Sequence, residues 1–184
     1  MIYTSFGKSS KDSKLSMAEP IASAHGLELH RLLPKHVMPF YENLSDENRV
    51  EFEQYYKFDP LEAILSILRD PMVFAITKGE EVLSITGLHD GAMWLLFNKN
   101  LRKNRVSFFR ASPVLVDYYH HFYEDIHCDV WVKNEMICQW LAKLGFKAIG
   151  VYDREGTDEQ FVRFVRCKKP ETNIFSMMTR PVMH

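Results

Sequence analysis

Apolar residues recur every three or four positions in some stretches of the chain and run almost without interruption in others. The helical spacing is clearest at 59–70, where Asp59 suits the N-cap position. Short apolar runs at 72–77, 81–88 and 92–98 are separated by turns that fit hairpins, so these runs predict antiparallel strands. The middle of the chain is therefore expected to fold as one helix followed by three strands.

The same periods predict the elements on either side of this central block. Ser107 could cap a helix, and Pro39 and Pro113 should interrupt or kink the helices in which they fall. The resulting order predicts an α+β fold, with a mixed and largely antiparallel sheet flanked by helices. The flanking elements are strand 27–33, helical segments 34–44, 45–56 and 107–124, strand 128–132, a helix that begins after Asn134, and strands 147–152 and 159–166.

The stretch NEMICQWLAKLGF, residues 134–146, carries signals for both ends of one helix. Asn134 is a preferred N-cap residue, and Gly145 suits the left-handed position that ends many helices. Phe146 would then fold back on Leu141, as in a Schellman motif. A buried stripe is expected from Met136, Ile137, Trp140, Leu141 and Leu144.

Composition and charge limit the classes of protein to which the chain can belong. Its 184 residues favour one domain, and a formal net charge of −1 gives no reason to expect specific nucleic-acid binding. No apolar run approaches the roughly 20 residues that span a bilayer, so no membrane partner is expected. Residues 1–26 are expected to form an extended arm, followed by a domain at 27–166 and a C-terminal tail at 167–184.

The order of elements across 27–166 resembles the GNAT fold of the acyl-coenzyme A N-acyltransferases. GNAT enzymes place an Asn after a strand and a Gly-Phe pair eleven and twelve residues later, as Asn134, Gly145 and Phe146 do here. The segments MWLLFN, VSFFRASP, VWVKN and WLAKLGFKAIG also resemble small GNAT-like proteins of short-tailed phages (podoviruses), a group that includes an internal virion protein.

The GNAT resemblance implies a site for the coenzyme pyrophosphate directly after the fourth strand of the domain. The family's glycine-rich pattern aligns with 102–107, where Arg105 replaces a glycine and Ser107 a second small residue. Glycines let backbone N–H groups approach the phosphates, which a long side chain obstructs. Without the coenzyme, this basic segment would be a solvated loop or would face an acidic partner. If acetyl-coenzyme A binds, the expected contacts are Arg102, Arg105, Ser107 and Asn134.

Residues for acyl-transfer chemistry are harder to find in the sequence. The family often places a tyrosine seven residues after the Asn, as general acid, but Leu141 stands there and cannot donate a proton. Other candidates are spread over the chain, and each is more simply a turn or packing residue, so no catalytic residue is assigned. These candidates are Tyr118, Tyr119 and Tyr123 for the acid, and Glu80, Glu81, His89 and Asp90 for the base.

A metal site is not expected. His120, His121, His127 and Cys128 lie near one another in the sequence, but their spacing does not match the short paired spacings of zinc sites. Cys128 and Cys138 are more simply buried small apolar residues than nucleophiles. The three cysteines also lack the spacing of a disulfide framework, which suits a reducing cytoplasm.

Two functions from different classes remain open. In the first, the chain is a virion-associated structural or interaction protein, built on a GNAT-like fold that has lost its catalytic residues and needs no cofactor. Its partners would be other virion proteins in a symmetric multi-copy assembly, bound through the N-terminal arm and the C-terminal tail. It would then reside in the virion, and in the host cytoplasm during assembly. In the second, the chain is an active N-acetyltransferase that uses acetyl-coenzyme A.

Overall fold

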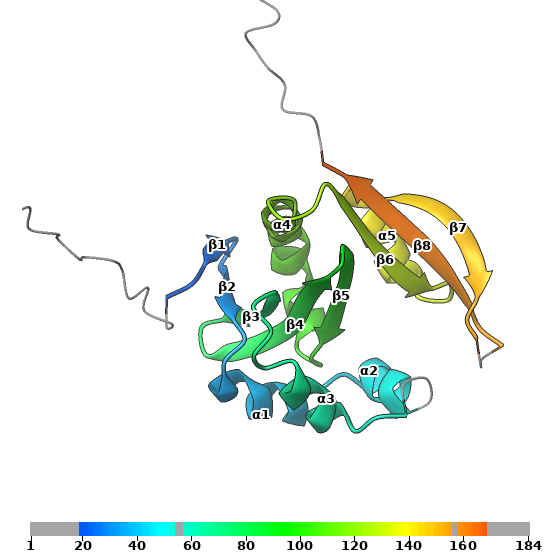
Figure 1. Cartoon of the computed structure of the whole chain (residues 1–184). Coiled ribbons are helices and arrows are strands. Elements are labelled where there is room, and N and C mark those ends of the chain that lie inside the picture. The colour runs from blue at the N-terminus through cyan, green and yellow to red at the C-terminus, as the bar shows by residue number, and fades with distance from the viewer. Residues whose placement is uncertain (1–18, 54–56, 156–157, 169–184) are drawn as a thin grey trace, which may run out of the picture.

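One mixed sheet with helices on both faces makes up the described part of the chain (Figure 1). The computed structural model describes residues 19–53, 57–155 and 158–168. Eight strands lie in the order β1-β2-β3-β4-β5-β6-β8-β7. This confirms the expected α+β class with a mostly antiparallel sheet.

Every neighbouring pair of strands in the sheet is antiparallel except one. The exception is β5–β6, which is parallel. Short turns join β3 to β4 and β4 to β5, as the spacing of the apolar runs predicted. The strands are β1 Ala22–Ala24, β2 Leu27–Arg31, β3 Val73–Lys78, β4 Glu81–His89, β5 Ala92–Phe97, β6 Asp125–Trp131, β7 Lys147–Asp153 and β8 Gln160–Cys167.

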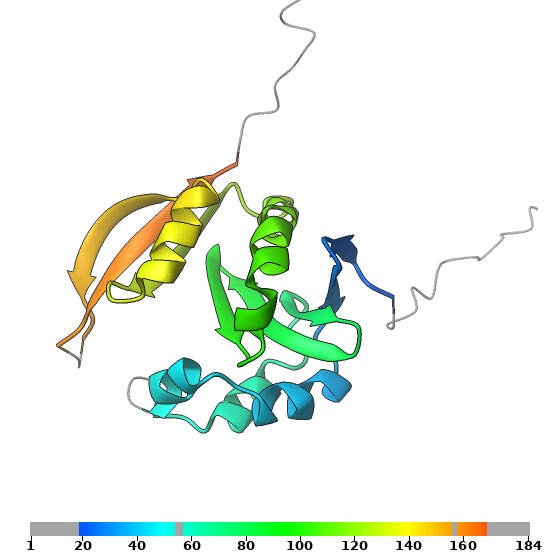
Figure 2. The ribbon, with the colours of Figure 1, turned by 180° about the vertical axis from the view of Figure 1, so that it is seen from behind.

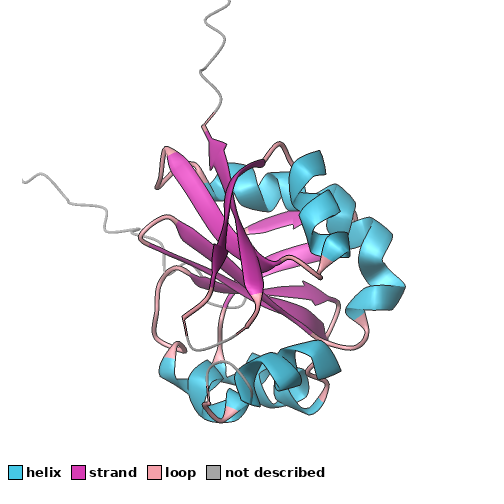
Figure 3. Ribbon diagram, turned by 90° about the vertical axis from the view of Figure 1, so that its right-hand side faces the viewer, coloured by secondary structure: helices cyan, strands magenta, loops and turns pink. Residues whose placement is uncertain are grey.

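Within the described residues, five helices pack against the sheet (Figures 2 and 3). Asp59 caps α3 as expected, accepting from the backbone N–H groups of Leu61 and Glu62. Pro39 lies inside α1 without ending it, at an exposed position. The helices are α1 Pro34–Glu42, α2 Asp46–Glu51, α3 Pro60–Ser66, α4 Leu101–Tyr119 and α5 Glu135–Lys143.

Two hydrophobic clusters lie on opposite faces of the sheet. Strand β3 shows why, because successive side chains of a strand point to opposite faces. Phe74 and Ile76 join the cluster that contains α4 and α5, and Val73 and Ala75 join the cluster that contains α1 and α3. The central strands are therefore buried on both sides, which explains their continuous apolar runs.

Helix α4 differs most from the sequence-based expectation. It begins at Leu101, so most of the basic segment expected to be a loop forms its first turns, and Ser107 lies inside the helix and caps nothing. Pro113 is also inside α4 and does not divide it. Residues on both sides of this proline, such as Phe108 and Tyr119, are fully buried against the sheet, and this packing outweighs the roughly 3 kcal/mol that an internal proline costs.

The fold begins before the boundary expected at residue 26. Residues Ala22–Ala24 form β1, and Ile21 donates its backbone N–H to Leu29 O, so this part of the expected arm belongs to the sheet. The rest of the arm, at 1–18, and the tail after residue 168 lie outside the described residues. Among the described residues, no helix has the length and apolar character needed to cross a membrane.

Both predicted ends of α5 are confirmed. Asn134 Oδ1 accepts from Ile137 N at 3.4 Å, and Gly145 has a φ of +86°. Phe146 N donates to Leu141 O and Gly145 N to Ala142 O, which is the hydrogen-bond pattern of a Schellman motif. The prediction that Met136 belongs to the buried stripe is wrong, because its side chain is 54% exposed. Met136 lies on the first turn of α5 and faces away from the sheet.

Candidate functional site

Strands β5 and β6 separate from each other along most of their length (Figure 1). Their only paired residues are Ala92 and His127, where His127 N donates to Gly91 O at 2.8 Å. By contrast, β4 and β5 pair from Ser84–Phe97 to His89–Ala92. The parallel pair thus opens from a single point, and the far end of β5 leads directly into α4. This opening and the turn that follows β5 form the candidate site.

The turn from β5 into α4 has its backbone N–H groups bonded inside the protein. Phe97 N donates to Asn48 Oδ1 at 2.7 Å and Asn98 N to Leu83 O at 3.0 Å. Lys99 N donates to Asn43 O at 2.8 Å. These bonds tie the turn to β4 and to the α1–α2 region, so the residues that hold it come from distant parts of the sequence.

Asn98 binds the remaining two N–H groups of this turn with its side chain. Its Oδ1 accepts from Asn100 N at 2.8 Å and from Leu101 N at 3.0 Å, and its Nδ2 donates to Val82 O. Asn98 is only 2% exposed. The five N–H groups of 97–101, here called the turn amides, are therefore all occupied. Asn100 is the N-cap residue and Leu101 the first residue of α4, so Asn98 occupies two of the N–H groups at the very start of this helix.

Two cations near the start of α4, one of them an expected phosphate contact, are paired with acids of α2. Arg102 forms an ion pair with Glu47, and Lys99 forms one with Asp46 at 3.0 Å. Both pairs are exposed, so each contributes little to stability, but each brings a carboxylate to the start of α4. Arg105 is exposed and has no ion pair within the described ranges.

Four aromatic rings connect β5 to α5 across the α4 side of the opening. Phe97 of β5 contacts Phe108 of α4, with ring centroids 6.1 Å apart. Phe108 and Phe109 then contact Trp140 of α5 at 5.5 and 6.1 Å, and the second pair is stacked. Trp140 and Phe108 are buried in the same cluster as Cys128 and the remainder of the α4–α5 core. On this side, the opening between β5 and β6 is therefore filled with side chains.

The other expected contacts do not join the turn. Asn134 caps α5, and Ser107 lies inside α4 beyond the first four residues, whose N–H groups are the free ones in a helix. Leu141, at the position of the family's tyrosine, is 1% exposed and packs in the core. Tyr119 does not replace it, because its hydroxyl is bonded to Thr86 Oγ1 at 3.1 Å inside the core. Burial raises the pKa of Tyr119, and the bond to Thr86 only partly opposes this effect.

The candidate bases are not brought together. Glu81, at the start of β4, accepts from Asn100 Nδ2, whereas His89 is the last residue of the same strand and Asp90 follows it. His89 Nε2 and Asp90 Oδ2 lie 3.4 Å apart, but both side chains are largely exposed. No cluster of three or more potential metal ligands occurs in the described part of the chain.

A second polar cluster, not found from the sequence, lies on the sheet face of β6, β8 and β7 opposite α5. Arg163 of β8 donates through Nε and Nη2 to the two oxygens of Asp129 of β6, each at 2.8 Å. This pair lowers the pKa of Asp129, and burial, followed by the nearby Asp129 carboxylate, raises the pKa of Tyr152. The guanidinium of Arg163 also lies over the Tyr152 ring, 5.7 Å from its centroid. Each charge in this cluster is already paired. The cluster therefore holds strands β6, β8 and β7 together rather than presenting a charged group to a ligand.

Comparison with protein-family models and with curated proteins finds no match. Solved structures do match. A GNAT acetyltransferase from Bacillus anthracis is 12% identical, with a TM-score of 0.64 over 79% of this chain and 96% of that one. One from Streptococcus agalactiae is 13% identical, with a TM-score of 0.63 over 80% and 99%. A spermidine N-acetyltransferase from Vibrio cholerae, solved with coenzyme A and spermine, is 13% identical, with a TM-score of 0.61 over 77% and 95%.

The chain therefore has the fold of the GNAT acetyltransferases, as its resemblance implied. The matched structures are acetyltransferases, and nothing in them links the chain to virion proteins. At such identities a likeness concerns the fold alone. Whether acyl transfer remains possible depends on the residues of the turn and the opening.

Proposed function

We propose that this chain is a GNAT-fold protein that binds a macromolecular partner and does not transfer acyl groups from coenzyme A. Partner binding rests on the resemblance of the sequence to GNAT-like virion proteins. The absence of acyl transfer is supported by one observation: the turn amides at 97–101 are all occupied, two of them by the buried side chain of Asn98. A pyrophosphate that approached the N–H groups of Asn100 and Leu101 would have to displace that side chain, which also donates to Val82 O. The aromatic rings between α4 and α5 support the same conclusion.

Isothermal titration of the whole chain with acetyl-coenzyme A tests this proposal. We expect no saturable heat at ligand concentrations up to about 1 mM, the range in which even weak specific binding is detected. A matched variant, Asn98→Gly, removes the capping side chain from the same turn and is expected to bind more tightly than the wild type if any binding appears. A wild-type dissociation constant well below 1 mM would contradict the proposal.

The second candidate is an acetyl-coenzyme A-dependent N-acetyltransferase, and the separation of β5 from β6 favours it. Its phosphate contacts would be Arg102 and Arg105, with Ser107 and Asn134 as further expected contacts. The Vibrio cholerae structure, with its coenzyme A and spermine, suggests a polyamine as the first acceptor to try. Release of free thiol from acetyl-coenzyme A in the presence of spermine, with loss in an Arg105→Ala variant, would establish this function.

A narrower form of the first proposal places the chain in a phage particle, with other virion proteins as partners. This placement depends on the resemblance of the sequence segments to podovirus proteins, and the N-terminal arm and C-terminal tail that would make the contacts lie largely outside the described residues. Mass spectrometry of purified particles tests it. The chain should be present at a fixed copy number, and its absence from particles would exclude this placement while leaving the wider proposal intact.

A further inference from the structure

A shallow apolar groove lies between helix α4 and β1, the short strand beside it (Figure 1). Strand β1 contributes Ala22 and Ala24 to its lining, and α4 contributes Ala111 and Val114. Val114 is 43% exposed, so an apolar side chain faces water in the middle of a helix. With a volume of about 30 Å³, the groove has room for side chains laid along it but not for a buried small molecule.

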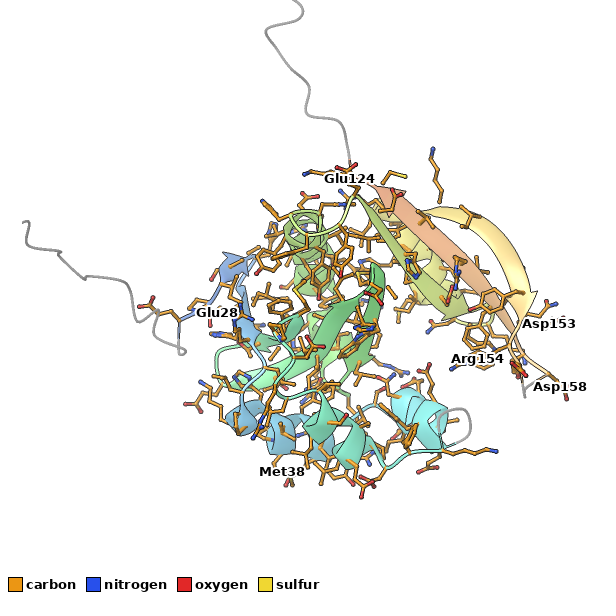
Figure 4. The ribbon with its side chains drawn as sticks, viewed as in Figure 1. Glu28, Met38, Glu124, Asp153, Arg154 and Asp158 are labelled. Carbon is orange, nitrogen blue, oxygen red and sulfur yellow. The ribbon has the colours of Figure 1, made fainter. Side chains whose placement is uncertain are left out.

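Two of the polar residues beside the groove are already bonded within the protein. Ser112 Oγ donates to Phe108 O at 2.6 Å. Glu28 of β2 lies at the edge of the sheet beside β1 (Figure 4), and its carboxylate is 3.1 Å from His30 Nε2, on the sheet face opposite α4. Binding in the groove would therefore come from covering apolar surface.

Basic side chains border the groove on the α4 side. Lys103, Arg110 and Val114 lie seven and four residues apart, so they share one face of the helix. The two cations are about 10 Å apart along the helix axis. Both are exposed, and neither forms an ion pair with any residue that the structure describes. Arg105 lies about 200° around the helix from Lys103, so this basic rim is distinct from the expected coenzyme contacts.

The charge of the rim decides what can cover the groove. Residues 1–18 contain three lysines and one aspartate, and residues 169–184 contain a lysine, an arginine and a glutamate, so both terminal segments are net basic and are repelled by the rim. Nucleic-acid phosphates would leave the apolar lining uncovered, and membrane-binding helices use apolar side chains that project outward rather than a recess. A protein segment with acidic and apolar residues on one face matches both the rim and the lining.

From these features we infer that the groove between α4 and β1 binds an acidic amphipathic helix of a partner protein. The apolar stripe of that helix covers Val114 and the alanines on both sides of the groove, and two of its acidic residues, seven positions apart, pair with Lys103 and Arg110. The inference rests on the partner binding proposed above and gives that partner a surface and a chemistry. It involves none of the turn amides, so titration with acetyl-coenzyme A tests the absence of acyl transfer separately.

Fluorescence anisotropy with a synthetic peptide tests the inference. The probe is a labelled helical peptide of about 18 residues, with leucines along one face and glutamates beside them, titrated with the whole chain up to about 200 µM. We expect saturable binding with a dissociation constant of about 10 to 100 µM, and none to a peptide of the same composition in scrambled order. Reversing both rim charges, with Lys103→Glu and Arg110→Glu together, should raise the dissociation constant about tenfold. Val114→Thr, which keeps the shape but adds a hydroxyl to the lining, should raise it about threefold.

Two controls separate groove binding from general charge effects and from damage to the fold. Arg69→Glu reverses an exposed charge next to α3, on the other face of the sheet, and should leave the dissociation constant unchanged. The thermal midpoint of each variant is measured as well, and the peptide should slow amide hydrogen exchange at 22–24 in the wild type.

Several outcomes overturn the inference while leaving the absence of acyl transfer intact. These are no binding of the peptide, equal binding of the scrambled peptide, unchanged exchange at 22–24, or a rim reversal without effect. Tighter binding of polyuridylate or of phosphatidylglycerol vesicles through the same two cations would identify a nucleic acid or a membrane as the occupant instead. A dimer of the chain alone that the rim reversal abolishes would identify a second copy.

Discussion

Replacing Asn98 with alanine should destabilise the fold, because its side chain makes three hydrogen bonds in a site that is 2% exposed. The substitution leaves Val82 O without its donor and removes the acceptor from the N–H groups of Asn100 and Leu101. Loss of a helix cap costs about 0.5 to 2 kcal/mol, and a buried carbonyl left unbonded costs about 1 to 3 kcal/mol. We therefore expect a loss of about 2 to 4 kcal/mol in the free energy of unfolding.

Urea denaturation measures this loss as a change in midpoint at constant slope. The matched control is Asn104→Ala in α4, where the side chain bonds only to Lys78 and to Asn100 O at a partly exposed position; its cost should be below about 0.5 kcal/mol. Amide hydrogen exchange at Asn100 and Leu101 should also speed up in the Asn98 variant alone. A cost under about 1 kcal/mol, or exchange rates equal to those of the wild type, would refute the capping role.

Three other changes probe the core and the pH response. Burial lowers the pKa of His36 to about 4, so the unfolded chain binds more protons than the folded chain between about pH 4 and 6.5. The free energy of unfolding should therefore rise with pH across that window by up to about 3 kcal/mol. Urea titrations at several pH values should show that His36→Gln flattens this rise. Trp140→Ala should lower the free energy of unfolding by about 3 to 5 kcal/mol. Trp140→Phe should lower it far less, because it keeps a ring in the stack with Phe109 and removes a buried N–H that has no partner. Thermal melts that rank the two variants equally would contradict this. Gly87→Ala would bring a Cβ within 2.3 Å of the Trp94 ring and should lower the unfolding free energy by about 1 to 3 kcal/mol, unless calorimetry shows that the ring simply moves aside.

The parts of the fold that the sequence predicted are those determined by neighbouring residues. The end of α5 is an example, because the cap of Asn134 and the left-handed Gly145 are set within one or two turns of the helix. Periodicity likewise placed most of the helices and strands, but not β1 or the first turns of α4. Met136 was assigned to the buried side because apolar spacing alone does not show where the sheet ends beneath the first turn.

The candidate site could not be predicted in the same way, because its bonds join distant parts of the chain. Asn98 bonds to Val82 O across the sheet, and Asn48 reaches Phe97 N from α2. Asn98 lies three residues before Leu101, the first residue of α4, so it is not at the N-cap position where a capping Asn is sought in a sequence. Only the folded structure shows that the basic residues after Asn98 already belong to α4.

The turn after β5 can satisfy its backbone N–H groups in one of two ways. Buried N–H groups need an acceptor, and at the start of a helix the acceptor is either a side chain or a bound anion. In glycine-rich phosphate loops small residues leave room there, so that phosphate can be the acceptor. Here Asn98 provides the acceptor for the N–H groups of Asn100 and Leu101, and the same residue donates to Val82 O, which joins the turn to β4. The side chain that stabilises the turn thus takes the place that an anion would need at these two N–H groups, and this is why the Asn98 variants test the stability of the fold and the proposed function together.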